Sequence, residues 1–168
     1  MWRSSPSSTM TNLCSEVLQS LAGKTLVTAE SITGGGIGAA LTAIPGSSSV
    51  YKGGIICYCN QVKNRVLGVD AGILETLGPV SAPVAEAMAE GACRVLKADV
   101  SVSVTGLAGP GGDEYGNPAG TVFIGCCING RTWVREYHFS GNREAVRHQT
   151  AQAALGLILE HWKGANLP

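Results

Sequence analysis

The order of strand-like and helix-like segments is the feature that most constrains how this chain can fold. Apolar, strand-like runs occur at residues 26–29 (LVTA), 53–59 (GGIICYC) and 99–106 (DVSVSVTG), and helix-like segments separate them. Two further strands flank Asn129-Gly130, a dipeptide that is a strong signal for a tight β-hairpin. Helices between strands, followed by an antiparallel hairpin, predict an α/β fold, namely a single layered domain with a mixed β-sheet flanked by helices.

Several segments carry the apolar spacing or the capping residues of helices. They are residues 11–22, a glycine-rich stretch from Ser31 or Thr33 to about Leu41, residues 60–67, a segment starting at Ser81, and residues 142–162. The loop from Gly106 to Pro118 is rich in glycine and long for a compact domain, so we expect it to be functional.

The length of 168 residues, 45% of them hydrophobic, suits one domain with a substantial core. We divide the chain into a disordered leader at residues 1–10, a domain at residues 11–163 and a short tail at residues 164–168. The leader lacks the apolar segment of a secretory signal. Its serines and its lack of acidic residues leave a transit-type leader open, although it is short for one.

Charge and cysteine usage argue against several classes of function. Lys plus Arg and Asp plus Glu both number 12, so the formal charge of zero predicts no nucleic-acid partner and no anionic membrane surface. No apolar run reaches transmembrane length. The six cysteines form no CxxC pair and the histidines show no ligand spacing, which argues against a zinc site. Cysteines in apolar runs are typical of a reduced, cytoplasmic protein.

The stretch TAESITGGG (28–36) contains the strongest candidate for a reacting side chain. Ser31 lies where a strand is expected to lead into a helix, so its hydroxyl would lie near helix N–H groups that can hold an oxyanion. Position alone favours a simpler interpretation, in which Ser31 or Thr33 caps the helix. A histidine base for Ser31 is a weak hypothesis, because all three histidines come late in the chain and no GxSxG motif occurs.

Lys63 is better placed to act as a base for Ser31. If the strands at residues 26–29 and 54–59 are neighbours, both side chains lie at the carboxyl ends of those strands, where α/β sheets bind ligands. Lys63 would have to be neutral to accept a proton, which burial or a nearby arginine would favour by lowering its pKa. The pattern alone favours a solvated helix lysine instead.

Two glycine-rich stretches and a pair of arginines are further candidates for binding a small polar ligand. GGGIG (34–38) and TGLAGPGG (105–112) lack the spacing of dinucleotide-binding and P-loop motifs, and ordinary tight turns explain them equally well. Arg143 and Arg147 lie four residues apart on one expected helix face, where they could clamp a phosphate or form surface salt bridges. We expect no metal and no cofactor.

Eight short motifs give the chain a family resemblance. They are AESITGG (29–35), PGSS (45–48), YCNQVK (58–63), LGV (67–69), GPVS (78–81), TGLAGPGG (105–112), PAGTV (118–122) and FSGNREAVR (139–147). Through these motifs, in this order, residues 11–163 strongly resemble the CinA C-terminal domain family, whose stand-alone members are nicotinamide mononucleotide (NMN) deamidases.

The resemblance implies a reaction and a site. It implies a compact domain that forms a homo-oligomer and hydrolyses NMN to nicotinate mononucleotide and ammonia, without a metal or a cofactor. It implies Ser31 as the nucleophile, Lys63 as the base and Tyr58 as an assisting group. The substrate-binding positions that it implies are Glu30, Thr33, Gly34, Gly35, Ser47, Ser48, Thr105, Gly106 and Arg147. Of these, Glu30 is expected to orient its neighbours rather than to react.

The chain departs from the family pattern at two places. The family often has Lys where this chain has Asn117, which could alter phosphate affinity, and Ser-Tyr-Ser where it has Cys57-Tyr58-Cys59. Larger relatives carry an N-terminal pyrophosphatase domain, and we assign none of its activity to this chain. Two alternatives stay open: a non-catalytic nucleotide-binding or regulatory CinA-like module, and an amidase for a related pyridine or pterin amide.

Overall fold

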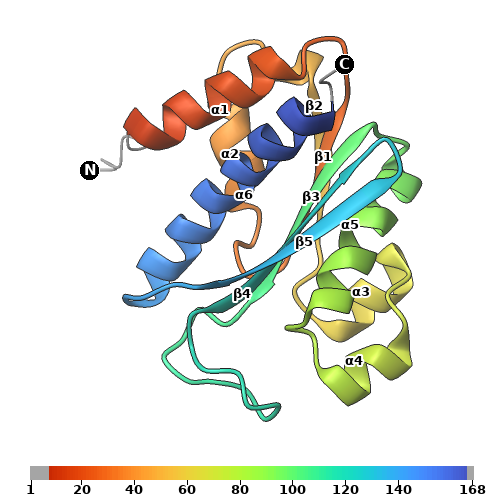
Figure 1. Cartoon of the computed structure of the whole chain (residues 1–168), viewed down its shortest axis with the longest axis vertical. Coiled ribbons are helices and arrows are strands. Elements are labelled where there is room, and N and C mark those ends of the chain that lie inside the picture. Colours follow the sequence, from red (N-terminus) through yellow and green to blue (C-terminus); the bar gives the residue numbers. More distant parts are fainter. Residues whose placement is uncertain (1–7, 166–168) are drawn as a thin grey trace.

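A mixed β-sheet lies at the centre of the structure, a computed structural model that describes residues 8–165. Within these residues its five strands lie in the order β2 (Tyr51–Ile56), β1 (Leu26–Glu30), β3 (Val100–Gly106), β4 (Thr121–Ile128) and β5 (Arg131–His138) (Figure 1). β1 pairs in parallel with β2 and β3, whereas the β3–β4 and β4–β5 pairs are antiparallel. The predicted mixed sheet is confirmed, and the first two strands are neighbours, which is the condition on which the placement of Ser31 and Lys63 depended.

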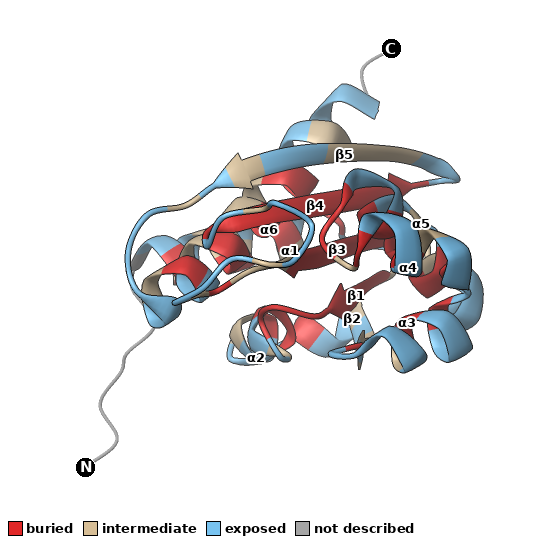
Figure 2. Cartoon of the chain, turned by 90° about the horizontal axis from the view of Figure 1, so that it is seen from below, coloured by how far each residue is buried: buried red, intermediate tan, exposed pale blue. Residues whose placement is uncertain are grey.

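Helices cover both faces of this sheet. The helices are α1 (Ser8–Ser20), α2 (Gly36–Thr42), the 3₁₀ helix η1 (Ser47–Ser49), α3 (Asn60–Leu67), α4 (Ala71–Leu77), α5 (Ala82–Leu96) and α6 (Arg143–Ala165). α1, α2 and α6 lie on one face, and α3, α4 and α5 lie on the other (Figure 1). The central strands β1, β3 and β4 are buried between these two layers, while β5 is partly exposed (Figure 2).

Valine and serine alternate along β3, but this alternation does not mark one buried and one solvent-exposed face of the strand. Its serines do not face solvent, because α5 covers them. Ser101 Oγ donates a hydrogen bond of 2.6 Å to the carbonyl oxygen of Ala89, and Ser103 Oγ donates one of 2.6 Å to that of Ala85. Both hydroxyls are therefore buried without an unpaired donor, and they tie α5 to the centre of the sheet.

The predicted hairpin between β4 and β5 is confirmed. Asn129 and Gly130 have φ angles of 50° and 85°, the left-handed conformations that a type I′ turn requires at its two central positions. The helix Ala71–Leu77 was not predicted, because seven residues are too few to show a clear apolar period. Asp70 begins it by accepting a hydrogen bond of 3.0 Å from the backbone N–H of Ile73.

The two ends of the domain lie beyond the predicted boundaries. α1 begins at Ser8 and Met10 is buried, so residues 8–10 belong to the fold and not to a leader. At the other end α6 continues to Ala165, past the boundary expected at residue 163. The rest of the predicted leader and tail, residues 1–7 and 166–168, lies outside the described residues. None of the described helices combines the length and the apolar composition that crossing a membrane requires.

Candidate functional site

Ser31 and Lys63 meet at the edge of the sheet where the parallel strands end. Ser31 directly follows β1, and its backbone N–H donates to the carbonyl oxygen of Val104 in β3 (3.0 Å). Lys63 lies in α3, which begins shortly after β2, the parallel neighbour of β1. The carboxyl ends of the two strands therefore bring both side chains together, and Lys63 Nζ lies 2.9 Å from Ser31 Oγ.

Lys63 is buried although it is a lysine. Only 1% of its surface is exposed, and Nζ donates hydrogen bonds to Ser31 Oγ and, at 2.6 Å, to the carbonyl oxygen of Cys57. No carboxylate pairs with it in the described part of the chain. Burial lowers the pKa of Lys63 from its ordinary value, because the charged form loses its hydration. Of the two causes considered from the sequence, burial is the one that operates, and no arginine contributes.

A cavity of about 220 Å³ opens in front of this pair. Its lining consists of Ser31 and Lys63, a mainly apolar wall of Ile32, Pro79, Val80, Gly106, Leu107 and Ala108, and the polar side chains of Tyr58, Asn60, Thr105 and Arg143. A flat ring could lie against the apolar wall while a carbonyl group points to Ser31. The cavity thus combines a serine hydroxyl, an adjacent buried amine and a mainly apolar wall.

Tyr58 and Arg143 form one side of the cavity mouth. Tyr58 is 62% exposed, and its hydroxyl accepts a hydrogen bond of 3.0 Å from Arg143 Nη2. Arg143 Nη1 donates to the carbonyl oxygen of Gly109 (2.8 Å), which ties α6 to the long loop between β3 and β4. The structure therefore places Tyr58 in the cavity lining, and among the described residues its hydroxyl bonds Arg143 and not Ser31 or Lys63.

Ser31 does not cap α2, and neither does Thr33. The helix begins only at Gly36, after a turn in which Gly34 and Gly35 have positive φ angles of 58° and 102°. The predicted start at Ser31 or Thr33 was wrong, because glycine conformations interpose a turn before the helix. Ser31 is therefore left free of a capping role.

Glu30 supplies the capping interaction instead. Its carboxylate accepts hydrogen bonds from the backbone N–H groups of Ile37 (2.7 Å) and Gly38 (3.1 Å) and from the hydroxyls of Thr33 (2.8 Å) and Thr28 (3.0 Å). A buried carboxylate with four donors at a helix start is well satisfied. Glu30 therefore holds the turn between Ser31 and α2 in place, and it does not line the cavity.

Arg147 also holds this turn. Its Nε donates to the carbonyl oxygen of Ile32 (3.2 Å) and its Nη2 to that of Thr33 (3.1 Å). Among the predicted substrate-binding residues, Glu30, Thr33, Gly34, Gly35 and Arg147 thus form or support the turn and do not line the cavity. The arginine that reaches the cavity is Arg143, one helical turn earlier.

The remaining predicted positions divide between the two edges of the sheet. Thr105 and Gly106 line the cavity, and Thr105 Oγ1 donates to the carbonyl oxygen of Pro79 (2.7 Å). Ser47 and Ser48 lie in η1, directly before β2 begins opposite the start of β1. They are therefore at the amino ends of the parallel strands, the edge opposite Ser31, and the chain does not bring them to this cavity.

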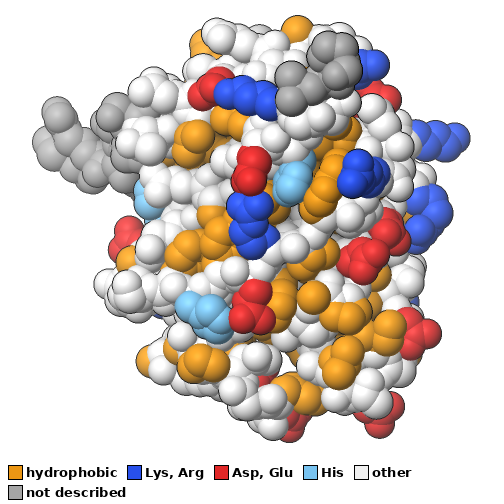
Figure 3. Space-filling view, viewed as in Figure 1, with side chains coloured by type: hydrophobic (Ala, Val, Ile, Leu, Met, Phe, Trp, Pro, Cys, Tyr) orange, Lys and Arg blue, Asp and Glu red, His pale blue; other side chains and the backbone are white. Residues whose placement is uncertain are grey.

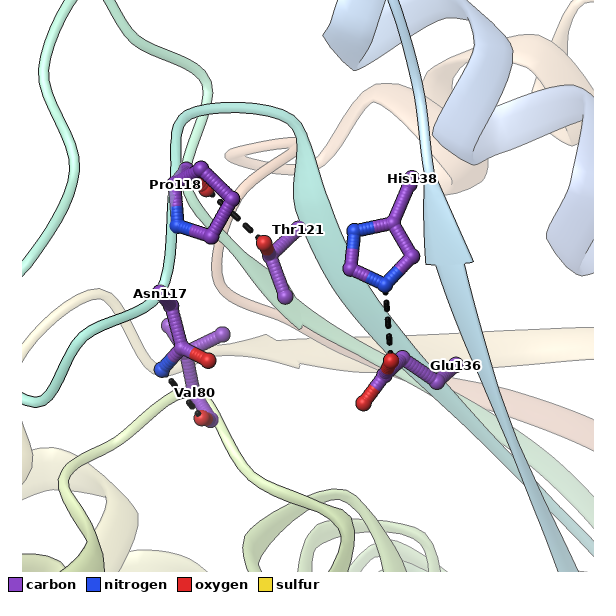
Figure 4. Close-up of polar contacts among 6 residues, drawn as sticks. All are labelled: Val80, Asn117, Pro118, Thr121, Glu136 and His138. Carbon is purple, nitrogen blue, oxygen red and sulfur yellow. Dashed lines mark hydrogen bonds and ion pairs between the residues drawn. The ribbon is translucent and has the colours of Figure 1, made fainter.

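Asn117, one of the departures from the family pattern, holds the long loop beside the cavity wall. Its Nδ2 donates to the carbonyl oxygen of Val80 (3.3 Å) and to Asp113 Oδ2 (2.9 Å). Figure 4 shows the Asn117–Val80 contact, the bond from Thr121 to the Pro118 carbonyl and the more distant ion pair of Glu136 and His138. Asn117 thus helps to place Val80, which sequence reasoning had not singled out.

Several other residues that line the cavity were not identified individually from the sequence. Leu107 and Ala108 lie in the glycine-rich stretch at residues 105–112, which had been linked to a ligand only as a whole. Asn60 lines the cavity as the first residue of α3, whose capping position is Cys59. All six cysteines are free thiols. Within residues 8–165 no group of three or more His, Cys, Asp or Glu side chains could hold a metal ion.

Comparisons with known proteins give a consistent result. The family model described as the CinA C-terminal domain matches residues 8–162. A CinA-like protein of Mycolicibacterium vanbaalenii is 43% identical over 144 residues, which cover 85% of this chain and 34% of that protein. A CinA-like protein of Thermosynechococcus vestitus is 47% identical over 138 residues, covering 80% and 33%. The chain thus spans about a third of the length of these relatives.

Solved structures are similar over nearly the whole chain. A CinA superfamily protein from Escherichia coli has a TM-score of 0.89 and 36% identity, covering 95% of this chain and 94% of its own. A competence/damage inducible protein from Agrobacterium tumefaciens has a TM-score of 0.90 and 35% identity, covering 94% and 98%. These structures match the chain as single domains of similar length.

Proposed function

The chain belongs to the CinA C-terminal domain family, and we propose that it is an amidohydrolase that converts NMN and water into nicotinate mononucleotide and ammonia. The observation that carries this proposal is the contact of 2.9 Å between the buried Lys63 Nζ and Ser31 Oγ in a cavity. A serine is a weak nucleophile until an adjacent base removes its proton, and a buried lysine with a lowered pKa can be that base. A module that only binds nucleotides has no need of such a pair.

The proposed reaction proceeds through an ester on Ser31. Neutral Lys63 takes the hydroxyl proton as Oγ attacks the carboxamide carbon, and a tetrahedral oxyanion forms. Protonated Lys63 then gives its proton to the leaving nitrogen, so that ammonia departs and a nicotinoyl ester remains. Lys63 next takes a proton from water as the water oxygen attacks the ester carbon. The C–Oγ bond then breaks, Lys63 returns the proton to Ser31 Oγ, and the nicotinic acid group formed loses its proton to solvent. Backbone N–H groups of the turn after Ser31 are the proposed donors to the oxyanion.

The cavity also suits the rest of NMN. The pyridine ring would lie against the apolar wall that includes Val80 and Leu107, and Thr105 and Gly106 would complete that wall. Arg143 is the cationic side chain at the mouth, and a guanidinium is well suited to bind a phosphate. We therefore assign phosphate binding to Arg143 and support of the nucleophile turn to Glu30 and Arg147.

Ammonia release from NMN by the purified protein tests the proposal. Wild type and a Ser49→Ala control should both release ammonia, because Ser49 is exposed and its hydroxyl bonds only the Gly46 carbonyl (2.8 Å). Ser31→Ala and Lys63→Met should release none above background. A chelator should leave the rate unchanged, since Ser31 and Lys63 are proposed to supply the nucleophile and the base.

Each other outcome has a definite meaning. Binding of NMN without ammonia release by wild type would replace the proposal with the regulatory module. Release from other pyridine or pterin amides, with none from NMN, would replace the substrate but keep the mechanism. Full activity of Lys63→Met would show that the base is another group.

A further inference from the structure

A second cavity adjoins the proposed active site and is not used by the proposed reaction. Its volume is about 370 Å³, and it lies between α3, α4 and the long loop that follows β3. Its polar or aromatic lining residues are Asn60, Gln61 and Asn64 from α3, Glu75 from α4, and Tyr115 from the loop. Asn60 lines both cavities, so a single extended ligand could occupy the two together.

The two cavities differ in charge. Lys63 and Arg143 line the first cavity, whereas the lining of the second contains no Lys or Arg and one carboxylate, Glu75. Phosphate groups therefore suit the first cavity and are disfavoured in the second. The second cavity is suited to a neutral group that makes many hydrogen bonds.

The amides of the second cavity are exposed to solvent, so a ligand could bond them in place of water. Among the described residues, the side chains of Asn60 and Gln61 make no hydrogen bond, and Asn64 uses only its Nδ2, which donates to the carbonyl oxygen of Val69 (2.9 Å). Asn and Gln amides match the donor and acceptor edge of adenine. A carboxylate such as Glu75 commonly binds the hydroxyl groups of the ribose in adenosine.

Tyr115 supplies a fixed aromatic surface beside these amides. Its hydroxyl donates to the carbonyl oxygen of Glu75 (3.0 Å), and its ring packs so closely on Gly78 that a Cβ there would lie 2.5 Å from Cδ2. A ring held at its hydroxyl and along one side offers a ready surface for stacking a nucleobase.

The first cavity alone is small for a ligand of the size of a dinucleotide. Its volume of about 220 Å³ is below the roughly 300–1,000 Å³ that is usual for small-molecule sites, and the second cavity adds adjoining space. We propose that the second cavity is an adenosine subsite, so that a pyridine dinucleotide such as NAD⁺ binds across both cavities with its carboxamide at Ser31. The placement of that carboxamide rests on the proposed function, but the adenosine subsite does not.

Calorimetric titration of wild type, Tyr115→Ala, Tyr115→Phe and Gln61→Ala with NAD⁺ and with adenosine tests the subsite. Loss of base stacking should weaken binding of both probes about tenfold or more in Tyr115→Ala. Tyr115→Phe keeps the ring and should stay within about twofold of wild type, while Gln61→Ala should weaken binding severalfold. Because neither residue lines the first cavity, kcat/KM for NMN should be the same in all four proteins.

Two results would overturn the inference. One is an absence of NAD⁺ binding to wild type at millimolar concentration. The other is NAD⁺ affinity that does not change in Tyr115→Ala and Gln61→Ala. Ammonia release from NMN is measured in the same preparations, so failure of the proposed reaction is seen separately. Adenosine binding that depends on Tyr115, in a protein that releases no ammonia, would keep the subsite and reject the amide placement.

Discussion

Lys63 is the residue whose protonation the proposed mechanism depends on. A lysine in water has a pKa of ~10.4 and is almost fully charged at neutral pH. Burial in this site lowers the pKa, so a larger fraction of Lys63 is neutral and able to accept the Ser31 proton. The carbonyl oxygen of Cys57 orients Nζ in either protonation state, because the neutral amine also keeps N–H donors for it.

The first prediction concerns the pH dependence of the reaction. Because only neutral Lys63 is active, kcat/KM for NMN should rise with pH, with a slope of about one in logarithmic units, and level off below ~10.4. Steady-state rates from about pH 6 to pH 11 would measure this profile in the free enzyme. A rate that is flat with pH, or that still rises above the ordinary pKa of lysine, would contradict Lys63 as the base.

The second prediction separates the two arginines of α6. Arg143→Ala should raise KM for NMN about tenfold to a hundredfold with little change in kcat, since a charged hydrogen bond contributes about 1.5–3 kcal/mol. Arg147→Ala should instead lower kcat, because the turn after Ser31 loses its two hydrogen bonds from the guanidinium. Steady-state kinetics of both variants make this comparison. A raised KM in Arg147→Ala together with a lowered kcat in Arg143→Ala would show that Arg147 binds the phosphate.

The sequence could predict that Ser31 and Lys63 meet at one edge of the sheet, but not which residues support them. Ser31 and Lys63 follow neighbouring parallel strands, and that topology alone brings them to one edge. The choice between Arg143 and Arg147 depends on how α6 lies against the turn, which spacing along one helix cannot reveal. Glu30 reaches four donors from three segments of chain, and such a network has no signature in the local sequence.

At the scale of elements, the close packing of α3 on α5 places Lys63. A Cβ added at Gly91 in α5 would collide with the backbone carbonyl of Leu67, the last residue of α3. The position thus allows only glycine at this helix contact. Any displacement of α3 would move Lys63 relative to Ser31.

The third prediction follows from this contact. Gly91→Ala should lower the free energy of unfolding by about 1–3 kcal/mol, as is usual for overpacking, and should also reduce kcat. Gly156→Ala in α6 is the matched control, because a Cβ there meets no atom within 4 Å. The control should gain about 0.5–1 kcal/mol from better helix propensity and keep full activity. Urea unfolding and ammonia release measure both quantities, and equal effects of the two variants would refute the argument.

Elements with strong local signals were predictable, and those defined by tertiary contacts were not. The β4–β5 hairpin was predictable because Asn-Gly is a residue pair that readily adopts the left-handed conformations found at Asn129 and Gly130. The start of α2 at Gly36 depends on the hydrogen bonds that its first N–H groups donate to the Glu30 carboxylate. The spacing of apolar residues does not show these bonds. The alternation in residues 99–106 predicted the strand β3, but the bonds of its serines to α5 have no signature in that pattern.

At the scale of the whole molecule, the apolar core covers the faces of the sheet, whereas the proposed active site lies at one edge of it. The apolar layers around α6 and α5 bury the two faces, and the cavity that contains Ser31 lies at the carboxyl edge of the parallel strands. The surface seen in Figure 3 carries apolar, acidic and basic side chains side by side, and no extended patch of one charge dominates that face. The homo-oligomer that the family resemblance implies stays a prediction.

The fourth prediction uses the folding of the whole domain to detect the ligand. A ligand that binds only the folded state stabilises it, and at a hundred times its Kd the gain is about 2.7 kcal/mol. For a domain of this size that corresponds to a rise in Tm of roughly 5–10 °C. Ser31→Ala should show this rise with NMN and a clearly smaller one with the same concentration of nicotinamide riboside, which lacks the phosphate that Arg143 is proposed to bind. Thermal unfolding followed by circular dichroism measures both. Equal shifts with the two ligands would contradict phosphate binding, and no shift with either would remove NMN as the substrate.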